Sequence, residues 1–353
     1  MKNLQDLNNI INNSLFDITL RVNDLKLWED VEHMISYVPV CYTNSYAEFN
    51  IAFQKYHGGD WLDISMIFKS ANKEVLAIWP LSISNIKNSY NLSSIRAPVL
   101  TPLFVKNITK NIKKKLISEC FKIIDKIYIS LGIKINKLDS CIPFLDRSDI
   151  STWHSTQIDN ISDLRLEYDL YLDVNRDLDS VKQDLRKSYK PLITSSTKIW
   201  NSFILSSYDE KIWKEFKILH LSVAGRVTRS DETWEIQHEL IKTKKAFLVY
   251  LRDKNKKMIA GGWYWHSKSE CEYGSGAFKR ELFDKPIGHL VQYNAIEEMI
   301  KRQIKWYRVG RKASINNIPT PDKKEINISL FKQGFSSHTM PTCYFKINLN
   351  IEK

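Results

Sequence analysis

The first half of the chain combines short apolar runs separated by polar turns with one long amphipathic segment. Apolar and β-branched residues at 61–68 and 74–83 predict a β-hairpin, and a third strand is expected near 94–100. Residues 107–131 carry apolar side chains at three- and four-residue spacing with lysines on the other face, which predicts a long helix. A short apolar strand at 134–141 is expected to follow it.

The second half repeats this order with clearer patterns. Helices are expected at 209–224, from Ser230 or Asp231 to 245, at 287–302 and at 326–332, and strands at 246–251, 258–265, 271–278, 305–309 and 343–349. Gly225 is placed to cap the first of these helices, and Gly274 and Gly276 in an aromatic strand indicate a β-bulge.

The shared order of elements predicts an α/β protein built from two copies of one unit. We place the units at 1–155 and 156–353, because Ser, Thr, Asn and Asp are frequent at 151–163. A length of 353 residues with 43% hydrophobic side chains is enough for two cores. Each unit is expected to hold a mixed, mostly antiparallel sheet flanked by helices.

Charge and cysteine content indicate the kind of partner and the cellular compartment to expect. A formal net charge of +12 favours a phosphate-rich partner. The 5 cysteines form no CxxC pair, so neither a disulfide framework nor a metal site is expected. No leader-like segment and no apolar stretch of about 18 residues is found, so we expect a cytoplasmic protein without a transmembrane segment.

The motifs of several common enzyme classes are missing. The sequence contains no GxSxG, HExxH, GxxxxGK[ST] or GxGxxG. Nucleophile-elbow hydrolases, zincins, P-loop enzymes and simple dinucleotide binders therefore lose their main support.

A basic cluster at 184–190 contains Arg186 and Lys187 just before Pro191. Guanidinium and ammonium groups of this kind bind a diphosphate or an RNA backbone. The alternative is that the cluster is only the solvated end of a helix. A second polar stretch at 225–237 places Arg226 and Arg229 as candidate anion ligands, with Asp231 beside them.

A third group lies around the last strand of the meander and the helix after it. The small residues around Gly276, next to Tyr273, would let a ligand approach the strand. Lys285, His289 and Tyr293 lie near the start of the following helix, where free N–H groups suit an anion. His289 is a candidate general base, or else an ordinary first-turn histidine.

The last candidate is Lys332, which stands next to Phe331 in the segment 331–335 (FKQGF). A lysine beside aromatic residues is usually a surface residue. In a partly desolvated place, however, its charge would act more strongly on a ligand.

Together these segments resemble the FemABX family, transferases with two tandem GNAT-like (acetyltransferase-like) domains that add amino acids to peptidoglycan precursors from aminoacyl-tRNA. The matching pieces are 185–190 (LRKSYK), Gly261-Gly262, 273–276 (YGSG), the helix 288–302, 306–310 (WYRVG) and 331–335 (FKQGF). Residues 78–81 (IWPL) and 102–104 (PLF) are closer to a branch associated with lipopolysaccharide, capsule or other surface-glycan loci.

The resemblance implies an acyl or aminoacyl transferase that acts on an amine of a cell-envelope precursor. By its motif, Lys332 would stabilise charge in the transition state. Solvent, His289 or a nearby carboxylate such as Asp231 would deprotonate the amine. The donor would be aminoacyl-tRNA or acyl-CoA, with no tightly bound cofactor. The acceptor would be a nucleotide- or lipid-linked precursor, which allows peripheral membrane contact, and no DNA partner is expected.

Two departures leave the donor open. No long helical hairpin of the kind that some tRNA-using members carry interrupts the second half, and 279–288 does not match the R/Q-x-x-G-x-G/A loop that holds coenzyme A. The alternatives are an acyl-CoA-dependent N-acetyltransferase of an amino sugar and a non-catalytic module that binds RNA or an anionic glycan.

Overall fold

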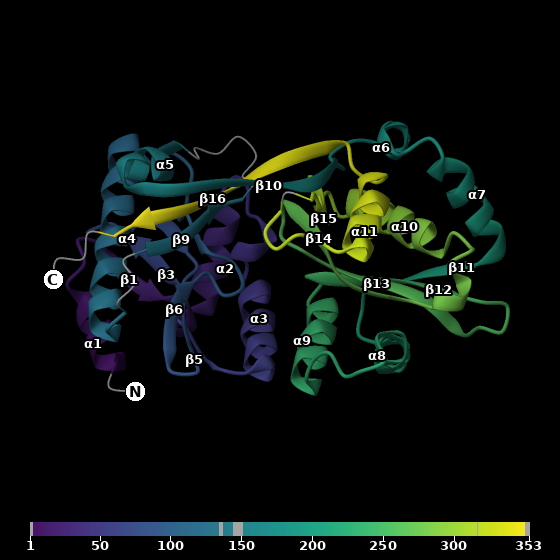
Figure 1. Ribbon diagram of the computed structural model, residues 1–353, viewed down its shortest axis with the longest axis horizontal. Coiled ribbons are helices and arrows are strands. Elements are labelled where there is room, and N and C mark those ends of the chain that lie inside the picture. Colours follow the sequence, from purple (N-terminus) through teal and green to yellow (C-terminus); the bar gives the residue numbers. More distant parts are fainter. Residues whose placement is uncertain (1–2, 134–136, 144–150, 316, 350–353) are drawn as a thin grey trace. The chain divides into compact units, whose positions relative to one another are not determined.

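The computed structural model describes residues 3–133, 137–143, 151–315 and 317–349. Contacts divide the chain into two compact units, one formed by 1–166 with 342–353 and the other by 167–341 (Figure 1). Within the described ranges, no helix combines the length and the apolar character needed to cross a bilayer.

The first unit contains small sheets packed with helices. Its helices are α1 (Asn3–Asn12), α2 (Leu25–Met34), α3 (Asn44–His57), α4 (Lys110–Leu131) and α5 (Ser151–Gln157). Its strands are β1 (Asp17–Leu20), β2 (Asp60–Asp63), β3 (Met66–Lys69), β4 (Val75–Trp79), β5 (Ser82–Ile86), β6 (Ser89–Ser93), β7 (Val99–Leu100), β8 (Leu103–Phe104) and β9 (Lys137–Ile142). One sheet has the order β1-β3-β4-β8 and another β2-β5-β6.

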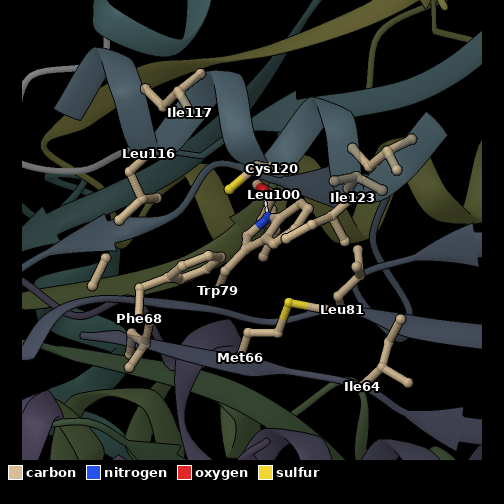
Figure 2. Packing of buried hydrophobic residues seen from close by; sticks show 14 of the residues in the cluster. Ile64, Met66, Phe68, Trp79, Leu81, Leu100, Leu116, Ile117, Cys120 and Ile123 are labelled. Carbon is tan, nitrogen blue, oxygen red and sulfur yellow. Dashed lines mark hydrogen bonds between the residues drawn. The ribbon is translucent and has the colours of Figure 1, made fainter. Parts of the chain in front are cut away.

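The core of this unit lies between β3, β4 and α4 (Figure 2). Trp79 is fully buried and its indole Nε1 donates a 2.7 Å hydrogen bond to the carbonyl of Leu100. Cys120 and Ile123 on the apolar face of α4 pack in the same cluster. Because this face is buried, its apolar residues recur at three- and four-residue spacing, and this pattern predicted the helix.

Two long strands each contribute residues to both units: β10 (Ile161–Asp173) and β16 (His338–Asn348). From Cys343 to Asn348, β16 pairs antiparallel with β9. This part of β16 therefore belongs to the first unit, whereas the sequence pattern groups the strand expected at 343–349 with the second half. The polar stretch at 151–163, where we place the boundary from the sequence, forms α5 and the start of β10.

The second unit is one twisted layer of strands with helices on both faces. Its helices are α6 (Leu178–Asp184), α7 (Tyr189–Ile199), α8 (Glu210–Ala224), α9 (Asp231–Lys242), α10 (Ile287–Lys301) and α11 (Lys323–Gln333). Its strands are β11 (Asn201–Leu205), β12 (Ala246–Arg252), β13 (Met258–His266), β14 (Glu270–Phe278) and β15 (Trp306–Arg311). The order is β11-β12-β13-β14-β15-β10, with β14 and β15 parallel and the other pairs antiparallel.

Neighbouring glycines of β13 show how the two faces are covered. A Cβ on Gly261 would lie 2.9 Å from the ring of Phe216 in α8, and a Cβ on Gly262 would lie 2.9 Å from Val291 in α10. Because successive residues of a strand point to opposite faces, α8 covers one face and α10 the other. Figure 1 shows the same arrangement of these helices around the sheet.

Most predicted elements agree with the structure, and several differ in extent. The hairpin strand expected at 61–68 forms β2 and β3, and the one expected at 74–83 forms β4 and β5. The helix expected at 107–131 begins at Lys110, because Thr109 is its N-cap and accepts from the N–H of Ile112. Of the strand expected near 94–100, only β7 at Val99–Leu100 forms, because the chain turns between Ser94 and Ala97, which are joined by an isolated bridge. Residues 134–136 of the strand expected at 134–141 lie outside the described residues, and β9 covers the rest.

Candidate functional site

Strands β14 and β15 separate after a short parallel pairing. Their register joins Glu270 to Trp306 and ends, within the residues described here, with Glu272 opposite Arg308. Beyond this point β14 carries a bulge at Gly274, where the register against β13 shifts, so the bulge expected from the glycines is confirmed. The register of β10 against β15 also shifts, beside Gly310.

Lys332 lies at this separation. Its Nζ atom is 5.5 Å from the ring centroid of Tyr273 on β14 and 2.5 Å from the position that a Cβ would take on Gly310. Gly310 has φ +139°, a conformation that other residues rarely adopt. The missing side chain at Gly310 is therefore what lets the ammonium approach the backbone of β15.

The local sequence explains how α11 holds this lysine. Asp322 and Glu325 form a capping box at the start of the helix, with hydrogen bonds of 2.7 and 2.9 Å. The predicted helix at 326–332 therefore begins earlier, at Lys323. Lys332 stands in the last turn, where the partial negative charge of the helix end favours a cation.

An ion-pair network surrounds Arg308 next to Lys332. The Nη1 atom of Arg308 donates to Oε1 of Glu272 at 3.1 Å, and its Nη2 donates to Oδ2 of Asp169 at 3.0 Å. The other oxygen of Glu272, Oε2, is buried and has no hydrogen-bond partner within the described part of the chain. One carboxylate oxygen at the separated strands is thus buried without a hydrogen-bond donor among the described residues.

Burial lowers the pKa of Lys332, and the charge of Arg308 lowers it further, while Glu272 and Asp169 raise it. Among the described residues, no carboxylate lies within ion-pair distance of its ammonium. The group is a partly desolvated cation whose charge is not neutralised by direct contact, so it would interact strongly with a negative charge on a ligand.

The predicted basic segment at 185–190 packs directly against the segment of Lys332. The backbone N–H of Arg186 donates to the carbonyl of Gly334 at 2.9 Å, and its Nη2 donates to the carbonyl of Leu330 at 3.1 Å. The hydroxyl of Tyr189 donates to the carbonyl of Phe331 at 3.1 Å. Two motifs far apart in the sequence thus form one structure, in which Arg186 supports the C-terminal end of α11 while Lys187 is exposed.

His289 lies in an aromatic enclosure beside this pair of segments. Its ring is 4.5 Å from that of Tyr189, 5.1 Å from that of Phe331 and 6.1 Å from that of Phe335. Burial lowers the pKa of His289 to about 4. A neutral imidazole packed in this way supports the fold around α11 and is a weak base. The geometry therefore favours an ordinary histidine of the first helical turn over a general base.

The predicted ligands of the stretch 225–237 do not gather around Lys332. Arg229 is buried, donates to Gln237 at 2.6 Å and stacks 4.6 Å from the ring centroid of Trp234. Arg226 is exposed. Asp231 is 83% exposed and forms a 2.5 Å ion pair with Lys217, so it is placed to stabilise the start of α9.

Some of the remaining predicted residues lie near Lys332, and others have partners elsewhere. Gly276 adjoins Tyr273, whose hydroxyl occupies the space that a Cβ on Gly276 would need. Lys285 is exposed and pairs with Asp284 at 3.1 Å, while Tyr293 on α10 has the ammonium of Lys182 5.6 Å from its ring centroid. The structure thus brings together Lys332, Tyr273, Gly276, Arg186 and His289.

Sequence reasoning missed the residues around Arg308. Glu272 and Asp169 are ordinary strand residues in the sequence, and only their register against β15 shows that they share one arginine. Gly310 falls within a segment quoted for the resemblance but had no role assigned. Among the described residues, no group of three or more His, Cys, Asp or Glu side chains is suited to hold a metal ion.

Most of the chain aligns with several solved structures. FemX aligns with a TM-score of 0.64 at 12% identity, covering 92% of this chain and 96% of that chain. L-PGS from Bacillus licheniformis aligns with a TM-score of 0.50 at 12% identity, covering 81% and 84%. A conserved protein of unknown function from Bacteroides thetaiotaomicron gives 0.53 at 9% identity, covering 95% and 99%.

No family model matches the sequence, and the comparison with curated proteins gives no match. Identities this low establish the fold alone. The predicted fold class, α/β with two tandem GNAT-like units, is confirmed, and the arrangement is FemAB-like.

Proposed function

We propose that the protein is an acyl or aminoacyl transferase that joins an activated carboxyl group to an amine of a cell-envelope precursor. The observation that carries this proposal is the partly desolvated ammonium of Lys332 at the separation of β14 and β15. A cation fixed there is suited to the oxyanion that forms when an amine attacks an ester or thioester. The FemAB-like fold and the motif around Lys332 agree with this chemistry.

The reaction would proceed by direct attack. The amine nitrogen bonds to the carbonyl carbon of the donor, and the carbonyl π electrons move to its oxygen, where the charge of Lys332 stabilises them. Collapse of this intermediate breaks the ester C–O or thioester C–S bond, and the leaving group departs with the bonding electrons. The proton lost by the amine passes to a base and then to the leaving group, so no covalent enzyme intermediate is required.

Glu272 is the base that the geometry favours. Its Oε2 atom has no hydrogen-bond partner in the described structure, while Oε1 is held by Arg308 at 3.1 Å. Arg308 would therefore fix the carboxylate without occupying both of its oxygens. His289 and Asp231, the bases proposed from the sequence, have other contacts: the first with aromatic rings and the second with Lys217.

The donor is proposed to be aminoacyl-tRNA or acyl-CoA, and the acceptor a nucleotide- or lipid-linked envelope precursor. The FemABX resemblance supports the first donor, and the GNAT-like fold supports the second. The resemblance to the branch linked to lipopolysaccharide or capsule suggests a precursor of one of these glycans as the acceptor. The proposed place of action is the cytoplasm, where both donors occur.

Two measurements test the proposal. Heat stability with coenzyme A, charged tRNA or nucleotide sugars identifies which donor and acceptor class binds, because a ligand of the folded state raises the melting temperature. Transfer is then measured with the ligands that bind. We expect Lys332→Ala to lower kcat about 100-fold. The matched control is Lys324→Ala, an exposed lysine of the same helix, which leaves turnover unchanged. Unchanged turnover in Lys332→Ala would refute the proposed role.

A further inference from the structure

Two hollows lie along α8 in the second unit. One, of about 460 Å³, is lined by residues of β11 and β12, the β12–β13 turn and the first half of α8. The other, of about 660 Å³, is lined by the C-terminal half of α8, the start of β13 and residues 279–281. Glu215 lines both hollows, so they adjoin along the helix, and we call the two together the α8 groove. None of the residues around Lys332 lines it.

The α8 groove is strongly basic. The cations that line it are Lys211, Arg252, Lys256, Lys257, Lys279 and Arg280, and the carboxylates are Glu215 and Glu281. Glu215 pairs with Arg252 at 2.6 Å, and Glu281 pairs with Lys279 at 3.6 Å. Within the described chain, Lys211, Lys256 and Lys257 have no carboxylate partner. The groove therefore suits a ligand that carries several negative charges.

An exposed aromatic ring stands at one end of the groove. Phe203 of β11 is 43% exposed and stacks on Tyr250 of β12, with 5.3 Å between ring centroids and 21° between planes. Tyr250 pairs with Gly261, which faces α8, so both rings lie on the face of the groove. A flat apolar ring open to solvent beside lysines is the arrangement on which nucleobases stack.

We propose that the α8 groove binds single-stranded nucleic acid, with phosphates on its lysines and a base stacked on Phe203. The length of the charged surface favours a polymer over a mononucleotide. Lys211 stands in the first turn of α8, while Arg280 donates to the carbonyl of Val223 in the last turn. These turns are about 18 Å apart along the helix, farther than one nucleotide reaches. This inference goes beyond the proposed transfer chemistry and does not depend on it.

The experiment measures the fluorescence anisotropy of a labelled, unstructured 12-nucleotide RNA on titration with the full-length protein. A DNA of the same sequence is the second probe and separates the two sources of the ligand. We expect the Kd to rise steeply between about 50 and 200 mM salt, because phosphate contacts release counterions. Uridine diphosphate is the competitor, and it should compete only weakly.

Two sets of variants locate the binding. Phe203→Ala and Phe203→Leu each remove the stacking ring, and we expect about tenfold weaker binding. The double variant Lys256→Glu with Lys257→Glu should weaken it by at least as much. The control, Lys114→Glu with Lys115→Glu, makes the same charge change on exposed positions of α4 and should leave the Kd unchanged.

Each outcome decides the proposal. Lack of binding to both probes at 50 mM salt overturns it, and so does wild-type affinity in both Phe203 variants. Equal losses in the two lysine pairs would show unspecific charge attraction and also overturn it. Equal affinity for uridine diphosphate would assign the groove to a mononucleotide instead. Binding is measured without turnover, so failure here leaves the role of Lys332 standing, and failure of transfer leaves this result standing.

Discussion

The Nζ atom of Lys332 lies 2.5 Å from the place where a side chain of Gly310 would begin. Gly310→Ala would therefore place a methyl group in the space of the ammonium. We expect the lysine to be displaced from the separated strands and kcat to fall at least tenfold, because the cation is no longer at the oxyanion position. Transfer assays under saturating donor measure this effect.

Backbone strain must be separated from this displacement. Gly310 has φ +139°, so alanine there also costs about 1 kcal/mol or more of stability. Gly132→Ala is the control, because Gly132 has φ +65° and a Cβ there would meet no atom within 4 Å. A Gly310→Ala protein that is folded, less stable than wild type and still fully active would contradict the proposed position of the ammonium.

The charge of Lys332 also predicts the alkaline limb of the pH profile. Burial lowers the pKa of its ammonium, so the cation is lost at a lower pH than for an exposed lysine. We expect kcat to decline as the pH rises through this lowered pKa. In Lys332→Arg the guanidinium stays charged, so the decline should move to higher pH even if the maximal rate is reduced. An unchanged alkaline limb in Lys332→Arg would assign the titration to another group.

Gly334, by its lack of a side chain, sets how closely the segment 185–190 packs against α11. A Cβ on Gly334 would lie 2.1 Å from Cε2 of Tyr189, although the backbone there has an ordinary φ of −69°. Gly334→Ala should therefore separate 185–190 from α11 and destabilise the protein by about 1–3 kcal/mol. Urea denaturation measures this. The double variant with Tyr189→Leu, which shortens the opposing side chain, should recover part of the loss.

The sequence predicted much of the second unit because its cues are local. Asp209, Ser230 and Gly225 cap the helices around them as their residue types suggest, and each accepts or donates the expected bond. The apolar runs of β12 and β13 are buried on both faces, which makes them visible as strands. Lys332 was found through its motif, which is also a local feature.

The rest of the site depends on register. Glu272, Arg308 and Asp169 stand on three different strands, and a shift of one residue in any pairing would separate them. Arg229 was expected to bind an anion because it is a charged residue in a connection, but the fold turns it inward to Gln237. Composition cannot show that the Arg229 side chain points inward, because this orientation follows from the packing of α8 and α9 on the sheet.

Buried histidines predict how stability depends on pH. Burial lowers the pKa of His289 to about 4, and it does the same for His220 and His266. In the unfolded chain these rings take up a proton near pH 6.5, so between about pH 6.5 and 4 the unfolded state binds more protons than the folded state. The free energy of unfolding should therefore fall as the pH falls through this window, and these groups should add no further change below about pH 4. His289→Gln removes one of these contributions, so the loss of stability between pH 7.5 and pH 5 should become smaller than in the wild type. Urea denaturation at both values measures the difference, with His57→Gln, an exposed site, as the control. An equal loss in wild type and His289→Gln would show that the His289 ring is protonated in the folded state at pH 5.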